Sequence, residues 1–202
     1  MKQVVLASRN QKKIVEIADL FAPHNIELLS VANLPHAPEV EETGTTFEEN
    51  AALKASEVAK AVHHWTIADD SGVVVDALGG APGVISARYA GENATDADNN
   101  AKLLAELSNV PDKKRTSHYV CVMALADPDG EIRLSVSGIC RGRILPEHRG
   151  SNGFGYDPLF LIPEYGRTFG ELSLEVKSQL SHRARALRQF IPKLVEILNA
   201  LD

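Results

Sequence analysis

The chain has 202 residues, of which 44% are hydrophobic and 24% are charged. These are ordinary values for a globular protein, so they exclude disordered and low-complexity classes, and the length suits one domain over residues 1–202. The chain has 21 Lys and Arg against 27 Asp and Glu, a net charge of −6. This charge argues against sequence-independent nucleic-acid binding, because such binding needs a broad basic face.

The cysteine content and the N-terminal segment indicate the compartment. Cys121 and Cys140 are too few for a disulfide framework, and their spacing is not that of a zinc site, so we expect reduced, buried thiols. Residues 1–6 carry one Lys, and the short apolar run there is interrupted by Ser8 and Arg9. This pattern is typical neither of a signal peptide nor of a membrane span, so we expect a cytoplasmic protein without a membrane partner.

The first thirty residues predict a β-α-β unit, which is the building block of an α/β sheet. The apolar run at residues 4–7 predicts a buried strand, and residues 26–31 predict a second strand. Between them, Pro23 ends a helix whose apolar positions recur at i, i+3, i+4 and i+7. These positions are Ile14, Ile17, Ala18 and Phe21.

An acidic loop and a capped helix follow. Residues 33–46 show no hydrophobic period and contain Pro35 and Pro38, which predicts a loop. Thr46, with Glu49 three residues later, predicts a capping box at the start of an Ala-rich helix over residues 47–62.

The next segment predicts two short strands and a long loop. Residues 66–68 and 73–75 are strand-like runs on either side of Asp69-Asp70-Ser71-Gly72, whose residue types suit a tight turn. Residues 78–93 contain four Gly and one Pro and predict a long irregular loop. Such loops inside compact domains tend to be functional.

The remaining elements are a helix, a hairpin and a closing helix. Residues 95–107 predict a helix, and Asp127-Pro128-Asp129-Gly130 predicts a hairpin between strands at 116–126 and 131–140. The apolar run at residues 159–162 precedes a final helix with Ser181 as N-cap. Its apolar stripe comprises Leu187, Ile191, Leu194, Leu198 and Leu201.

Residues 8–13, with the sequence Ser-Arg-Asn-Gln-Lys-Lys, stand where the first predicted strand ends and the first helix begins. Backbone N–H groups and the positive end of the helix dipole favour an anion there. The glycines of a P-loop are absent, so side chains and the helix end would bind a phosphate. The alternative interpretation is an N-cap followed by solvated lysines.

Carboxylates cluster in two places. Glu39, Glu41 and Glu42 lie in the acidic loop, where they suit a hard cation such as Mg²⁺ or form a solvated surface. Asp69 and Asp70 end an apolar strand, and neighbouring strand residues point to opposite faces. One of the two is therefore a ligand or base and the other orients its surroundings, unless the pair only makes a turn.

Two further segments suit a ligand. Glycines around Phe154 and Tyr156 allow close backbone approach, and either ring could cover a flat heterocycle or fill the core. Lys177 precedes Ser181-His182-Arg183, whose cations would oppose the dipole at the start of the last helix. An anionic or carbonyl-bearing ligand would compensate them, and a solvated basic face is the alternative.

Six blocks, in order along nearly the whole chain, resemble the inosine/xanthosine triphosphate pyrophosphatase family. They are Ser8-x-Asn10-x-x-Lys13; Glu42-Thr43-Gly44-x-Thr46-Phe47-x-x-Asn50-Ala51; Ala68-Asp69-Asp70-Ser71-Gly72; Gly79-Gly80-Ala81-Pro82-Gly83 with Ser86-Ala87-Arg88-Tyr89; Gly153-Phe154-Gly155-Tyr156-Asp157-Pro158; and Glu171-Leu172-x-x-Glu175-x-Lys177-x-x-x-Ser181-His182-Arg183. The chain departs from the family at Arg9, where members usually have Gly. Arg9 is strained if that position needs a positive φ.

The resemblance implies an elongated, two-lobed α/β fold with a central mixed twisted sheet flanked by helices, a cleft between the lobes, and a homodimer. It implies that ITP, dITP, XTP and dXTP react with water to give the monophosphate and pyrophosphate. Asp70 is the implied base and, with Glu42, the implied ligand of Mg²⁺, with Mn²⁺ as a second possible ion. A related pyrophosphatase for modified pyrimidines and a non-catalytic nucleotide sensor are the rival interpretations.

The resemblance also implies the substrate contacts. Hypoxanthine and xanthine carry a carbonyl at C6 where adenine carries an amino group, so donors from His182 and Arg183 would favour the former. Lys54 would neutralise phosphate, or else be an ordinary surface lysine. The implied substrate-binding residues are Ser8, Arg9, Asn10, Gln11, Lys12, Lys13, Lys54, Ser71, Phe154, Gly155, Tyr156, Asp157, Lys177, His182 and Arg183.

Overall fold

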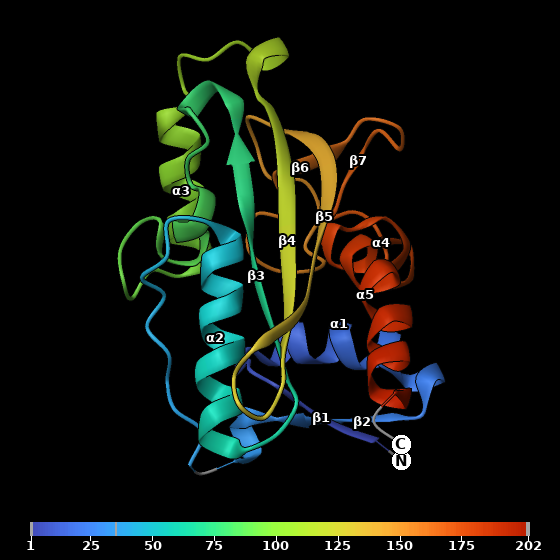
Figure 1. The fold of residues 1–202 in the computed structure, drawn as a ribbon. Helices are drawn as coiled ribbons and strands as arrows, with labels where there is room; N and C mark the ends of the chain where they lie inside the picture. The colour runs from blue at the N-terminus through green and yellow to red at the C-terminus, as the bar shows by residue number, and fades with distance from the viewer. Residues whose placement is uncertain (1, 35, 201–202) are drawn as a thin grey trace. The chain divides into compact units, whose positions relative to one another are not determined.

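A computed structural model describes residues 2–34 and 36–200, so Met1, Pro35 and Leu201, which entered the sequence analysis, lie outside the described residues. Figure 1 draws the chain as a ribbon coloured by residue number. The chain divides into two compact units. Unit 1 comprises the described residues up to Asp70, Cys121–Gly138 and the residues from Arg183 onward. Unit 2 comprises Ser71–Val120 and Ile139–His182. The expectation of one domain over residues 1–202 stays a prediction.

The described strands form one mixed sheet in the order β2-β1-β3-β4-β5-β6-β7. Strand β1 is parallel to β2 and β3, whereas β6 is antiparallel to β5 and β7. The predicted mixed α/β sheet is therefore confirmed, and the predicted cleft stays a prediction. The strands are β1 Lys2–Leu6, β2 Ile26–Ser30, β3 Thr66–Val75, β4 Thr116–Ala126, β5 Ile132–Ile144, β6 Phe160–Ile162 and β7 Arg167–Thr168.

Helices α1, α2, α3 and α5 begin and end close to the predicted residues, whereas α4 was not predicted. The α-helices are α1 Gln11–Phe21, α2 Phe47–Val62, α3 Asp96–Glu106, α4 Leu174–Leu180 and α5 His182–Asn199. Short 3₁₀ segments are Ala22–His24, Val31–Asn33, Asp76–Leu78, Gly83–Arg88 and Asp112–Lys114. The predicted capping box at Thr46 and Glu49 is present, because each side chain accepts from the other residue's backbone N–H.

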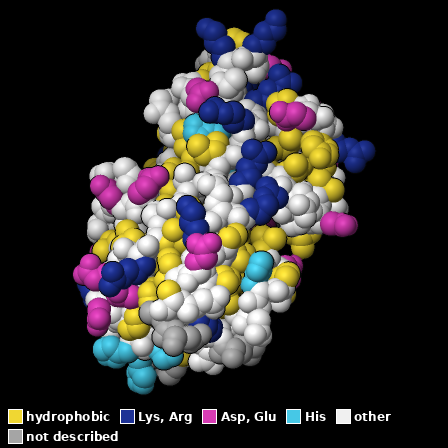
Figure 2. Space-filling model, turned by 45° about the vertical axis from the view of Figure 1, so that its right-hand side comes forward, with side chains coloured by type: hydrophobic (Ala, Val, Ile, Leu, Met, Phe, Trp, Pro, Cys, Tyr) yellow, Lys and Arg dark blue, Asp and Glu magenta, His cyan; other side chains and the backbone are white. Residues whose placement is uncertain are grey.

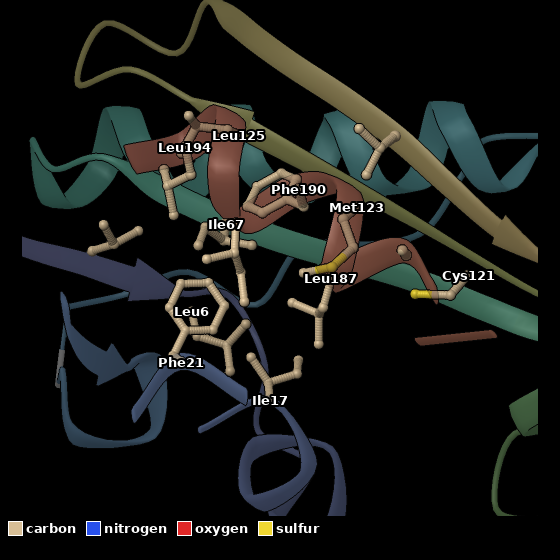
Figure 3. Packing of buried hydrophobic residues seen from close by; sticks show 14 of the residues in the cluster. Leu6, Ile17, Phe21, Ile67, Cys121, Met123, Leu125, Leu187, Phe190 and Leu194 are labelled. Carbon is tan, nitrogen blue, oxygen red and sulfur yellow. The ribbon is translucent and has the colours of Figure 1, made fainter. Parts of the chain in front are cut away.

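The core of unit 1 follows from the two-residue period of its strands. Val4 and Leu6 of β1 belong to a buried cluster with residues of α1 and α5 (Figure 3). Val5 instead belongs to a second cluster that contains Val58 of α2. Helices α1 and α5 therefore pack on one face of β1, and α2 packs on the other.

Unit 2 has its own aromatic core. The ring of Tyr119 lies 4.5 Å from the rings of both Phe160 and His182, and it is stacked on His182 at an interplanar angle of 8°. Leu103 of α3 is fully buried in the same cluster as Tyr119. Each unit therefore buries an apolar core of its own.

One prediction about local structure is wrong, and one helix was missed. Strand β3 continues through Asp69-Asp70-Ser71-Gly72, and Gly72 is not among the positive-φ residues of the described chain, so no tight turn forms there. Strand β3 pairs with β1 at Thr66 and Ile67 and has β4 as its other neighbour in the sheet, and this pairing overrides the turn preference of the residues that follow Ala68. Helix α4 was not expected. Ser181 ends it by donating its N–H to the Lys177 carbonyl, and α5 begins at the next residue.

The surface carries mixed charges. Lys and Arg side chains are interspersed with Asp and Glu over the face drawn in Figure 2.

Both cysteines are free and buried, as predicted. None of the helices found within residues 2–34 and 36–200 has the length and apolar character that a bilayer crossing requires.

Candidate active site

Strand β3 directs its two adjacent aspartates to different partners. Asp69 accepts from Lys13 Nζ at 3.0 Å and from Arg183 at 3.2 Å, and these residues belong to α1 and α5. Asp70 accepts from Asn50 Nδ2 at 3.2 Å and from Lys54 Nζ at 3.4 Å, both on α2. The expectation that the two carboxylates point to opposite faces is confirmed.

Lys54 links Asp70 to the acidic loop. Its Nζ lies 2.6 Å from Glu42 Oε1 and 3.4 Å from Asp70 Oδ1. The Lys54 side chain is only 12% exposed, so the interpretation as an ordinary surface lysine is wrong. Burial alone would lower the pKa of Lys54, but the carboxylates of Asp70, Asp69 and Glu42 outweigh burial and raise it. Lys54 is therefore a fixed positive charge between two carboxylates.

The Asp70 carboxyl has a raised pKa. Burial raises this pKa above its ordinary value and Glu42 adds to the shift, whereas Lys54 opposes it. A carboxylate with a raised pKa holds a proton more readily, which is the property that a general base requires. Asp70 is thus chemically suited to accept a proton from water.

Glu42 and Asp70 fit the donor set of a magnesium ion. Both carboxylates lie within 3.4 Å of the same ammonium group, so they converge on one place. Mg²⁺ prefers oxygen ligands and commonly takes one or two carboxylates, with water or phosphate oxygens completing its shell. In the part of the chain that the structure describes, no three His, Cys, Asp or Glu side chains make a metal-binding group. A magnesium ion bound by Glu42 and Asp70 would therefore need water or phosphate oxygens as its other ligands.

Asp69 forms a buried ionic cluster. Burial alone would raise its pKa, but Lys13 and Arg183 outweigh burial and hold the pKa far below its ordinary value. Arg183, at 3% exposed, also donates to Glu16. Asp69 therefore orients Lys13 and Arg183, which matches the expectation that one aspartate of the pair orients its surroundings.

The polar segment at residues 8–13 forms the start of α1. Asn10 Oδ1 accepts from the N–H groups of Lys12 and Lys13 at 3.0 and 3.2 Å, so Asn10 is the N-cap. Ser8 Oγ accepts from the N–H of Asn10. Arg9 is not among the positive-φ residues, and its guanidinium donates to the Ala37 carbonyl at 3.1 Å. The strain considered for Arg9 is therefore absent. Arg9, Asn10, Gln11 and Lys12 are exposed, and Ser8 and Lys13 are half-buried.

The glycine-rich segment of unit 2 forms around Asp157. Asp157 Oδ2 accepts from the N–H of Phe154 at 2.9 Å and from Lys177 Nζ at 2.7 Å. Lys177 Nζ also lies 4.6 Å from the centre of the Phe154 ring. A Cβ on Gly153 would lie 2.0 Å from Asp157 Oδ2, so this position needs glycine both for space and for its φ of +78°.

The other predicted residues of unit 2 differ in exposure. Tyr156 is buried, so its ring fills the core. Its hydroxyl donates to the Ser86 carbonyl at 2.8 Å, and burial raises the pKa of this hydroxyl. Phe154 and Ser71 are half-buried. His182 is 5% exposed and stacked on Tyr119. The contacts of these residues with a substrate stay predictions.

Sequence reasoning assigned no role to several residues that position the site. Asn50 is fully buried and bonds to Asp70, and its Oδ1 accepts from the N–H of Gly44. The spacing of Asn50 and Lys54, i and i+4, could have indicated that they share one face of α2. No local spacing could have indicated the bond of Arg183 to Glu16 or that of Gly155 to Asp96. The two partners are 167 residues apart in the first bond and 59 residues apart in the second.

Comparison with known proteins gives concordant matches over nearly the whole chain. The Ham1 family model matches residues 4–193. A dITP/XTP pyrophosphatase of Rhodopirellula baltica is 52% identical over 200 residues, which cover 99% of this chain and 96% of that protein. The dITP/XTP pyrophosphatase of Geobacillus kaustophilus is 50% identical over 198 residues, covering 98% and 97%. The solved HAM1 protein of Coxiella burnetii is 42% identical with a TM-score of 0.89, covering 97% of this chain and 100% of that chain.

Proposed function

This chain belongs to the Ham1 family, and we propose that it hydrolyses the non-standard purine nucleoside triphosphates ITP, dITP, XTP and dXTP to the monophosphate and pyrophosphate. The observation that carries the proposal is the 52% identity to a dITP/XTP pyrophosphatase over nearly the full length of both chains. The convergence of Asp70, Lys54 and Glu42 supports it, because hydrolysis of a phosphoanhydride bond needs a base and cations close together. Such an activity removes these nucleotides before they enter DNA or RNA.

In the proposed reaction, a water oxygen bonds to the α-phosphorus and the bond from that phosphorus to the α,β-bridging oxygen breaks. Asp70 accepts the proton of the water, and its raised pKa suits this task. Lys54, Lys13 and Lys177 would neutralise charge on the phosphate oxygens, together with donors from residues 8–12 and Ser71. A magnesium ion held by Glu42 and Asp70 would supply further charge neutralisation when bound.

Base selection is proposed to depend on hydrogen-bond donors. His182 and Arg183 would donate to the C6 carbonyl of hypoxanthine or xanthine, which adenine lacks. Stacking on Tyr119 holds the His182 ring in one orientation, and Asp69 and Glu16 hold the Arg183 guanidinium. Preorganised donors discriminate strongly, because a wrong base would leave them without an acceptor. Phe154 would stack on the purine, with Gly155, Tyr156 and Asp157 beside it.

A substrate panel tests the proposal directly. Pyrophosphate release would be measured for ITP, dITP, XTP, GTP, ATP and dUTP, each with Mg²⁺ and with Mn²⁺. We expect the highest kcat/KM for ITP, dITP and XTP. Faster hydrolysis of dUTP than of ITP would indicate a pyrimidine-specific pyrophosphatase instead. Tight binding of ITP without any hydrolysis would indicate a nucleotide sensor.

We further propose that the protein acts as a homodimer on the free nucleotide pool of the cytoplasm. The family resemblance supports the dimer, and the net charge of −6 supports a small-molecule substrate over nucleic acid. Sedimentation equilibrium at several concentrations would measure the mass in solution, and a constant monomer mass would contradict the dimer. Salt-dependent binding to duplex DNA would contradict the choice of substrate.

A further inference from the structure

Two side chains of α3 form hydrogen bonds with the backbone of one residue, Gly155, in the glycine-rich segment of unit 2. The N–H of Gly155 donates to Asp96 Oδ2 at 2.8 Å. The carbonyl of Gly155 accepts from Asn100 Nδ2 at 2.9 Å. Asp96 and Asn100 stand four residues apart, so they lie on one face of α3. The backbone N–H and the backbone carbonyl of Gly155 are therefore both hydrogen-bonded to α3.

These bonds restrain Phe154 from its C-terminal side. The N–H of Phe154 donates to Asp157 Oδ2, and the next N–H along the chain, that of Gly155, donates to Asp96 Oδ2. The two peptide groups that flank the Phe154 Cα are thus each bonded to a carboxylate. Because charge-assisted hydrogen bonds are stronger than neutral ones, this arrangement strongly limits rotation of the Phe154 backbone.

Helix α3 is itself firmly anchored. Thr95 and Asp98 form a capping box at its start. Asn99 accepts from the N–H of Ala90 and donates to the Ala87 carbonyl, and Leu103 is fully buried. Asn100 is only 3% exposed, so its bond to Gly155 is shielded from water. A rigid helix therefore holds the segment, as a precise binding site requires.

We propose, on the basis of the function proposed above, that Asp96 and Asn100 are positioning residues that hold Phe154 in the orientation for stacking on the purine. Neither side chain touches the substrate in this proposal. Ordering the segment before the nucleotide arrives lowers the entropy cost of binding. Loss of the clamp, meaning these two bonds to Gly155, is therefore expected to weaken substrate binding more than it slows the chemical step.

Asp96 is the residue to substitute in the test, because it is exposed and its replacement leaves the buried core intact. We expect Asp96→Ala to raise the KM for ITP about tenfold and to change kcat less than about twofold, because a charge-assisted hydrogen bond is lost. Asp96→Asn keeps an oxygen that can accept from Gly155, so its KM is expected to stay within about threefold of the wild-type value.

Asp98→Ala is the matched control. Asp98 lies in the same helical turn and caps α3 through Thr95, and none of its hydrogen bonds among the described residues reaches Gly155. A merely structural effect at the helix start would change KM equally in Asp96→Ala and Asp98→Ala, and that result would overturn the proposal. In a Phe154→Ala background, Asp96→Ala is expected to change KM less than about twofold, because the clamp acts through Phe154. A full tenfold effect there would also overturn it.

A second measurement needs no substrate. Amide hydrogen exchange at Gly155 is expected to accelerate at least about tenfold in Asp96→Ala relative to Asp98→Ala, because the amide loses its acceptor. Equal exchange rates would contradict the clamp. If the wild-type protein releases no pyrophosphate from ITP, the proposed function fails and the positioning role fails with it. If it does release pyrophosphate and the Asp96 variants match the control, only the positioning role fails.

Discussion

Asn50 joins the candidate base to the acidic loop. Its Nδ2 donates to Asp70 Oδ2 at 3.2 Å, and its Oδ1 accepts from the N–H of Gly44 at 2.8 Å. A Cβ on Gly44 would lie 2.6 Å from Asn50 Oδ1, so glycine permits this close approach. Because Glu42 stands two residues before Gly44, one buried amide orients Asp70 and also anchors the loop that carries Glu42.

Replacing Asn50 with leucine is expected to affect both stability and the pH dependence of activity. The substitution leaves the Gly44 N–H without its partner, which we expect to lower the free energy of unfolding by about 2 kcal/mol. The Asn50 hydrogen bond lowers the pKa of Asp70, so its loss raises that pKa further. Because the base acts deprotonated, the acidic limb of the pH profile of kcat/KM is expected to move to higher pH. A purely structural role would lower activity without moving this limb.

Asp70→Asn tests the base. Asparagine has nearly the same shape and cannot accept the proton, so we expect kcat to fall about a thousandfold. Binding of ITP, measured by isothermal titration calorimetry, is expected to stay within about tenfold of the wild-type value, because the remaining substrate contacts are intact. Undiminished pyrophosphate release would exclude Asp70 as the base.

Gly153→Ala tests the packing of the glycine-rich segment. The added methyl group would lie 2.0 Å from Asp157 Oδ2, at a φ of +78°. We expect the free energy of unfolding to fall by about 3 kcal/mol in urea denaturation, since both strain and a clash are introduced. Gly166→Ala is the control, because its φ is +61° but no atom lies within 4 Å. This control is expected to lose only about 1 kcal/mol. Equal losses would show that the approach of Asp157 is not the cause.

The Cys121 thiol is expected to be unreactive in the folded protein. Burial raises its pKa to about 12, with a further contribution from Asp69. A thiol whose folded pKa exceeds its unfolded value contributes stability at neutral pH and loses it as the pH rises from about 9 toward 12. Labelling with dithionitrobenzoate at pH 8 should therefore be negligible before denaturation and complete in guanidinium. Rapid labelling of the native protein at Cys121 would contradict the burial described.

Local signals in the sequence determined much of the secondary structure. The capping box of Thr46 and Glu49, the hairpin at Asp127–Gly130 and the stripe from Ile14 to Phe21 each depend on residues a few positions apart. The resemblance of six ordered motifs also identified the family that the comparisons then found. Such features are readable because their physical causes lie within one or two turns of chain.

The tertiary structure decided what the polar residues contact. Alternation along β3 predicts that Asp69 and Asp70 face opposite ways, but only the fold brings Lys13 and Arg183 to one and Asn50 and Lys54 to the other. The turn expected at Asp69–Gly72 is absent, because the place of β3 in the sheet, beside β4 from a distant part of the chain, outweighs local turn preference. Pairing between residues far apart in sequence depends on how the whole chain packs, and no local pattern encodes it.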